Sequence, residues 1–86
     1  MKYFASFSAN GGSTYSNKPY EYSNKKEAIR SIKSILRSNH FRQPYNTSRY
    51  TVWDENNILV AYGSLNGNGW WSVDVDEIGH SINDTL

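Results

Sequence analysis

The 86-residue sequence contains no cysteine, only one methionine and only two prolines. Without cysteine the chain forms no disulfide, offers no thiolate ligand to a metal and has no thiol nucleophile. This composition suits a reducing compartment, and we expect a cytoplasmic protein. The first residues, MKYFASFSANGG, lack the apolar run of a signal peptide, and no stretch approaches the roughly 20 apolar residues that span a bilayer. We therefore expect no membrane insertion.

Lysine and arginine are absent from the chain after Arg49. Residues 50–86 contain six acidic residues and neither lysine nor arginine, whereas residues 18–49 contain eight basic residues and two glutamates. The net charge is nevertheless only +1. Such asymmetry can steer charged partners toward one side of a molecule. The alternative is that the two halves neutralise each other within the fold.

The sequence also lacks the patterns that mark catalytic, metal and phosphate sites. His40 and His80 belong to no HxxxH or HxxE pattern, and the carboxylates of Asp74, Asp76 and Glu77 do not continue into a calcium-binding loop. Neither a Gly-x-Ser-x-Gly elbow nor a glycine-rich phosphate loop is present. We expect a protein that is not an enzyme and that needs no metal and no cofactor.

Most of the stretch from Ser23 to Phe41 is predicted to form the one long helix, which ends near Asn39. Its apolar residues follow a 3.6-residue period and form one stripe: Ala28, Ile29, Ile32, Ile35 and Leu36. A second, basic stripe is predicted to face outward and consists of Lys26, Arg30, Lys33 and Arg37. Asn24 followed by Glu27 fits a capping box, although Ser23 is an alternative cap. One side of this helix is expected to be buried and the other to stay wet and positive.

Strand patterns flank the helix. Residues 2–8 alternate in polarity, and residues 49–53 and 58–63 surround the polar loop Asp54–Asn57 as a hairpin would. The turn at residues 66–69 leads into a last strand at residues 70–75. Residues 13–24 are expected to be irregular and partly extended, with a short edge strand as the alternative. We predict a single α+β domain over residues 1–86, with the helix on a roughly four-stranded antiparallel sheet of order β-α-β-β-β. The helix is expected to pack on Val52, Val60 and Val73, while the other sheet face stays partly open and residues 77–86 fray.

The adjacent tryptophans Trp70 and Trp71 must point to opposite faces of the last strand if both belong to it. We expect Trp71, Val73 and Val75 on the inner face, with Trp70, Ser72 and Asp74 on the other face. Trp70 then remains half exposed, packs on tyrosines across the sheet, or is covered by the tail or a partner.

Two kinds of binding function are compatible with this pattern. In the first, the basic stripe with help from Lys25, Arg42 and Arg49 follows the phosphates of a nucleic acid, and exposed aromatics stack on bases. In the second, the domain binds a protein, with the charged patches as steering and aromatic side chains as anchors. The candidate anchors are Trp53, Trp70, Tyr50 and Tyr62. We favour protein binding, since the near-neutral chain is unlike dedicated nucleic-acid binders and contains no known module. Self-association into a homodimer through a strand edge is a third hypothesis.

The β-rich part of the chain, residues 49–76 with the segment ILVAYGSLNGNGWWSVDVD, resembles small proteins encoded by phages and mobile elements. Together with the small size, the lack of cysteine and the strand–helix–hairpin–strand order, it is most similar in style to anti-CRISPR proteins. The resemblance implies a stoichiometric inhibitor that binds a host CRISPR–Cas effector and blocks its nucleic-acid binding or its nuclease step. No functional residue carries over by motif, so the candidate partner-binding residues remain Lys26, Arg30, Lys33, Arg37, Trp70, Trp53 and Tyr62.

Overall fold

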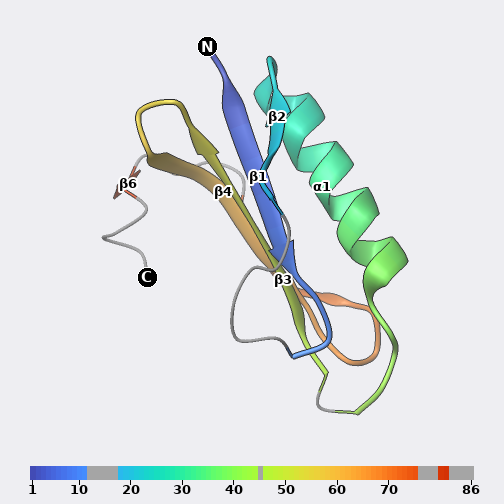
Figure 1. Ribbon diagram of the computed structural model, residues 1–86. Helices are drawn as coiled ribbons and strands as arrows, with labels where there is room; N and C mark the ends of the chain where they lie inside the picture. Colours follow the sequence, from blue (N-terminus) through green and yellow to red (C-terminus); the bar gives the residue numbers. More distant parts are fainter. Residues whose placement is uncertain (12–17, 45, 76–79, 82–86) are drawn as a thin grey trace.

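The computed structural model describes residues 1–11, 18–44, 46–75 and 80–81, and consists of one helix on an antiparallel sheet (Figure 1). Along the chain the elements are β1 (Tyr3–Ser8), β2 (Tyr20–Tyr22), α1 (Lys25–Asn39), β3 (Ser48–Asp54), β4 (Ile58–Leu65), β5 (Trp71–Val75) and β6 (His80–Ser81). The predicted α+β class is confirmed. Among the described residues, no helix is long and apolar enough to cross a membrane.

The sheet has the strand order β2-β1-β3-β4-β5, and every pairing is antiparallel. The short β6 also pairs with β4, at Ile58 and Leu59, whereas β5 pairs with β4 from Tyr62 to Leu65. The predicted order lacked β2, because residues 13–24 were expected to be irregular. The expected fraying of residues 77–86 lies outside the described residues except at His80 and Ser81, whose backbone forms β6.

The helix begins where the sequence predicts. Asn24 is the N-cap, with an extended backbone, and its Oδ1 accepts a hydrogen bond of 3.1 Å from the backbone N–H of Glu27. This satisfies one of the amide groups that a helix start leaves unpaired. Fully buried Ala28, Ile32 and Leu36 follow at intervals of four residues and face the sheet. Ile29 and Ile35 border this stripe and are only half-buried.

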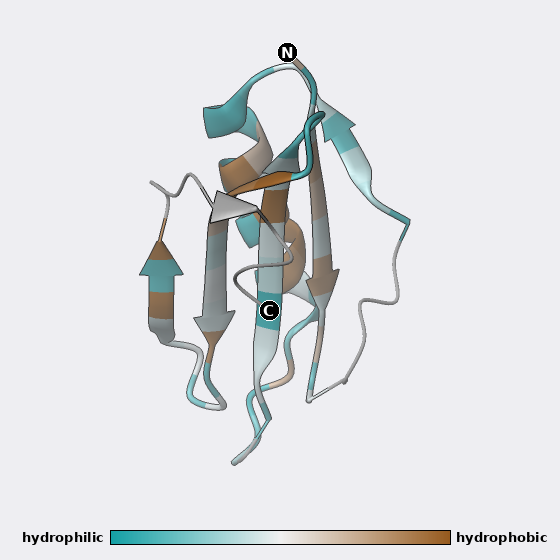
Figure 2. Ribbon diagram, turned by 90° about the vertical axis from the view of Figure 1, so that its left-hand side faces the viewer, coloured by the Kyte–Doolittle hydropathy of each residue, from teal (hydrophilic) through white to brown (hydrophobic). Residues whose placement is uncertain are grey.

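The core lies between α1 and the central strands. Its strand residues include Ala5 of β1, Tyr50 and Val52 of β3, and Val60 and Ala61 of β4, all of them buried. In Figure 2 the helix lies behind the strands, and hydrophobic residues recur on both. Val73 does not join this core as predicted, since 39% of it is exposed.

A bulge in β5 explains this difference. Val73 pairs with Ser64 and Trp71 pairs with Leu65, so Ser72 is an extra residue on its strand. An extra residue reverses the alternation of faces beyond it. Trp71 therefore packs on the helix side as expected, but Asp74 lies on that side too, while Val73 and Val75 lie on the other. The predicted grouping of Trp71 with Val73 and Val75 is wrong for this reason.

The end of the helix is tied to two strands through Asn10, which adopts a left-handed backbone with φ of 58°. Its Nδ2 donates to the backbone oxygen of Asn39 at 2.9 Å, and its Oδ1 accepts from the backbone N–H of Phe41 at 2.6 Å. The backbone N–H of Asn10 donates to Ser48 Oγ at 3.0 Å, and His40 Nδ1 lies 2.6 Å from the same oxygen. These bonds hold the segment after α1 in place, and with it Arg42.

Candidate functional site, a cationic flank beside an exposed tryptophan

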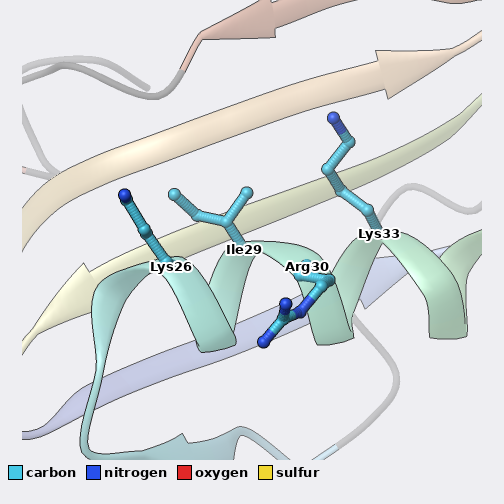
Figure 3. Close-up of a pocket in the computed structure, with 4 residues that line it drawn as sticks. All are labelled: Lys26, Ile29, Arg30 and Lys33. Carbon is cyan, nitrogen blue, oxygen red and sulfur yellow. The ribbon is translucent and has the colours of Figure 1, made fainter.

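The basic stripe of α1 lies along the flank of the helix that faces β5. Lys26, Ile29, Arg30 and Lys33 line an open hollow of about 330 Å³. Figure 3 shows the side chains of Lys26, Ile29 and Lys33 pointing the same way across the sheet, whereas Arg30 points to another side. The hollow therefore has an apolar floor at Ile29 and cationic side chains around it. Within the described residues, Lys26 and Arg30 form no ion pair.

Lys33 is engaged within the protein itself. Its Nζ donates a hydrogen bond of 2.5 Å to Asp74 Oδ2, and the hydroxyl of Tyr50 donates to Asp74 Oδ1 at 2.7 Å. Partial burial raises the pKa of Asp74, but the hydrogen bonds from Lys33 and Tyr50 and the charge of Lys33 lower it by more, so the net pKa lies below its ordinary value. At this point the two charged halves of the chain do neutralise each other.

The ring of Trp71 lies beneath two of the helix cations. Lys33 Nζ is 4.8 Å from its centroid and Arg37 Cζ is 5.9 Å from it. Tyr50 meets the same ring edge to face, with the centroids 5.6 Å apart. Cation–π contacts of this kind contribute roughly 0.5–1 kcal/mol each at exposed sites. Trp71 therefore supports the middle of the basic stripe and holds Lys33 and Arg37 close to the sheet.

Trp70 is presented by a tightly hydrogen-bonded turn between β4 and β5. The backbone of Asn66 bonds with Gly69 and with Trp70, each at 2.9 Å. Asn66 Oδ1 also accepts from the backbone N–H groups of Asn68 and Trp70, at 3.0 and 3.1 Å. Gly69 supplies the left-handed conformation that the turn needs, with φ of 83°. On this turn 72% of Trp70 is exposed, so it lies outside β5 and outside the core.

A second hollow, of about 200 Å³, lies beside Trp70. It is lined by Arg37 of the helix, Arg42 of the following loop, Asn68, Gly69 and Trp70. The guanidinium of Arg42 lies so close to Gly69 that a Cβ at that position would come within 2.9 Å of Arg42 Nε. We call the surface formed by both hollows the cationic flank; it comprises Lys26, Ile29, Arg30, Lys33, Arg37, Arg42 and Trp70.

Two of the predicted partner-binding residues do not belong to this surface. Trp53 follows Val52 and Tyr62 follows Ala61, and both Val52 and Ala61 belong to the core on the helix side. Because successive residues of a strand alternate between faces, Trp53 and Tyr62 lie on the opposite face of the sheet. Both are half-buried, and Trp53 stacks on Phe4 with the ring centroids 6.3 Å apart. Tyr50, a further candidate anchor, is fully buried under the helix. The structure thus brings together Lys26, Arg30, Lys33, Arg37 and Trp70 and leaves the other aromatics elsewhere.

Residues with catalytic or metal-binding chemistry do not converge in the described part of the chain. No three His, Cys, Asp or Glu side chains there are grouped so that they could hold a metal ion. His40 and Ser48 are within hydrogen-bond distance, as a base and a nucleophile would be, but Ser48 is fully buried beneath the end of the helix. This pair belongs to the junction around Asn10.

Two residues of the flank were not among the predicted partner-binding residues, although Arg42 was named as a helper of the basic stripe in the nucleic-acid hypothesis. Ile29 was assigned to the buried stripe, and its position at the border of that stripe was the available signal. Arg42 lies in a loop without periodicity, so only the fold places it beside Trp70.

No protein-family model matches this chain, and neither a curated protein nor a solved structure matches it.

Proposed function

We propose that this protein is a non-catalytic binding protein that holds a protein partner on its cationic flank, with Trp70 as the main anchor. The observation that carries the proposal is the exposure of Trp70 on a turn that is already ordered by Asn66. Tryptophan and arginine are the residues that most often dominate the energy of protein interfaces. A turn of this kind presents the indole without a further ordering cost on binding.

The charges of the flank favour a protein over a nucleic acid. A nucleic-acid backbone needs a continuous track of free cations. Here Lys33, in the middle of the stripe, is paired with Asp74, whose carboxylate remains 35% exposed and would repel a phosphate passing beside it. The whole chain carries a net charge of only +1. The flank thus has cations at its two ends and a neutral pair at its centre. A protein surface with separate carboxylates complements this pattern better than a polyphosphate does.

The resemblance to anti-CRISPR proteins supports a more specific form of this proposal. In that form the partner is a host CRISPR–Cas effector complex, and the bound protein blocks its nucleic-acid binding or its nuclease step.

A photo-crosslinking pull-down from host lysate tests the proposal. The wild-type chain, with a photo-reactive residue in place of Asn68, should capture a defined protein complex. Trp70→Ala should weaken that capture by at least about 30-fold, the effect of losing a hot-spot side chain. Arg49→Glu is the matched control, because Arg49 is an exposed arginine of β3 outside the flank.

Equal capture by the wild type and Trp70→Ala would contradict the proposal. So would the absence of any captured protein together with a salt-sensitive gel shift of DNA or RNA that is lost in Arg30→Glu. That second result would instead support the alternative, a small nucleic-acid-binding domain that uses the basic helix face.

A further inference from the structure

The cationic flank contains two similar subsites. At the first, Ile29 lies between Lys26 and Lys33, and Arg30 lines the same hollow but points to another side (Figure 3). At the second, Trp70 is grouped with Arg37 and Arg42. Each subsite therefore combines one accessible apolar side chain with at least two cations. An apolar side chain with a neighbouring carboxylate is the complementary group for such a subsite.

The spacing of the subsites follows from the helix. Ile29 and Arg37 are eight residues apart on α1, which corresponds to about 12 Å along the helix axis. The first subsite and Arg37 of the second lie on the same flank of α1, with Trp70 beside Arg37, so a straight element beside the helix reaches both. A second helix has the same rise per residue, and its side chains seven or eight residues apart lie on one face with the required separation.

The region between the subsites differs from its two ends. Lys33, which lines the first hollow on the side toward the second, is neutralised by Asp74, and the ring of Trp71 lies below it. A carboxylate of the partner gains a free cation at either end but meets the carboxylate of Asp74 in the middle. The charge of the bound segment should therefore be distributed as acidic, neutral, acidic.

We infer that the flank binds an amphipathic helix of its protein partner that carries two apolar anchors seven or eight residues apart. One anchor enters the Ile29 subsite, the other packs against Trp70, and acidic residues flank each anchor but are absent between them. This inference rests on the proposed function and specifies the chemistry of the partner segment.

Three synthetic helical peptides of about 15 residues test the inference. The matched peptide has two leucines seven residues apart with glutamates beside each. The second has the same composition with the leucines four residues apart, and the third has the matched leucines with the glutamates moved between them. Binding is followed by tryptophan fluorescence, and the sites are located by NMR shifts of Ile29 and of the Trp70 indole.

The matched peptide should bind at least about 10-fold more tightly than either isomer, since it alone fills both subsites without facing Asp74. Arg30→Glu and Arg42→Glu should each lower its affinity about 5- to 10-fold, and Arg49→Glu should leave it unchanged. Circular dichroism of each variant shows whether the fold is retained.

Equal binding of all three peptides, or no binding of any, overturns the inference. The proposed function then still stands if capture of the host protein depends on Trp70. It fails separately if that capture is insensitive to Trp70→Ala. A competition experiment gives one more test. The inference is also overturned if a second copy of this chain or an oligonucleotide displaces the matched peptide at a concentration lower than that of the peptide.

Discussion

Asp74 is the residue at which the charged surface and the core meet. Its carboxylate accepts hydrogen bonds from Lys33 on the helix and from Tyr50 in the core. The pair with Lys33 has side chains 28% and 35% exposed, so solvent screens it and its contribution is modest. It links β5 to the helix, although the two elements have few other contacts that could set their relative position.

Asp74→Asn should therefore lower the free energy of unfolding at pH 7 by about 0.5–1 kcal/mol, as for a partly exposed pair. The pKa of Asp74 is lower in the folded state than in the unfolded state. The contribution of ionised Asp74 to the free energy of unfolding is thus complete above its pKa in the unfolded state. It is lost as the pH falls through its pKa in the folded state. In urea titrations the gap between wild type and variant should close below about pH 4. Glu21→Gln, which removes an exposed partner of Lys2, is the control and should have less effect. A gap that persisted unchanged at low pH would contradict this account.

The position of Asp74 also shows a limit of prediction from sequence. Strict alternation along residues 70–75 placed Asp74 on the face opposite Trp71. The position of the bulge at Ser72 is determined by how β5 pairs with β4, and no local residue pattern predicts it. Trp71 itself was placed correctly, because the side of a residue next to the turn does not depend on the bulge.

At the level of elements, α1 was predicted most completely. Its apolar period, its cap and its basic stripe are local properties, and α1 lies within the predicted stretch from Ser23 to Phe41. The strand β2 was only the alternative interpretation of residues 13–24, because Tyr20–Tyr22 is a short, largely exposed edge strand. Its pairing with β1 determines its structure, and a three-residue segment has too little pattern to predict that pairing.

Asn24→Ala should destabilise the protein by about 1 kcal/mol, because the N–H of Glu27 would lose its acceptor at the start of the helix. Ser23→Ala should change the stability by less than about 0.5 kcal/mol, since Asn24 and not Ser23 is the cap. Urea unfolding monitored by far-UV circular dichroism measures both. A larger effect from Ser23 than from Asn24 would assign the cap to Ser23 instead.

At the level of the whole molecule, charge contributes little to stability, and we propose that it serves recognition. Two ion pairs are present in the described residues, and the pair of Lys2 with Glu21 is highly exposed. The helix cations Lys26, Arg30 and Arg37 lie on the flank. The sequence predicted these cations as a stripe, but their assembly with Trp70 and Arg42 depends on the loops around Asn10 and Asn66.

Raising the salt concentration from about 0.05 M to about 0.5 M should change the free energy of unfolding by less than about 0.5 kcal/mol, because exposed pairs contribute little. The same change should slow the association of the matched acidic peptide at least several-fold, because screening removes electrostatic steering. Chemical denaturation and stopped-flow fluorescence measure the two effects. An association rate that does not respond to salt would exclude steering by the flank.

The junction at Asn10 has a consequence for the chemical ageing of the protein. Asn10 precedes Gly11, and an asparagine followed by glycine is prone to deamidation because no side chain hinders attack by the next backbone nitrogen. In the folded state the Gly11 nitrogen is held by Thr47, with a donor–acceptor distance of 2.6 Å, so the reaction needs this loop to open. The resulting carboxylate would no longer donate to Asn39 and would add negative charge at the carboxyl end of the helix, where the dipole disfavours it. Damage at a single amide would therefore loosen the end of the helix next to Arg42 and Trp70.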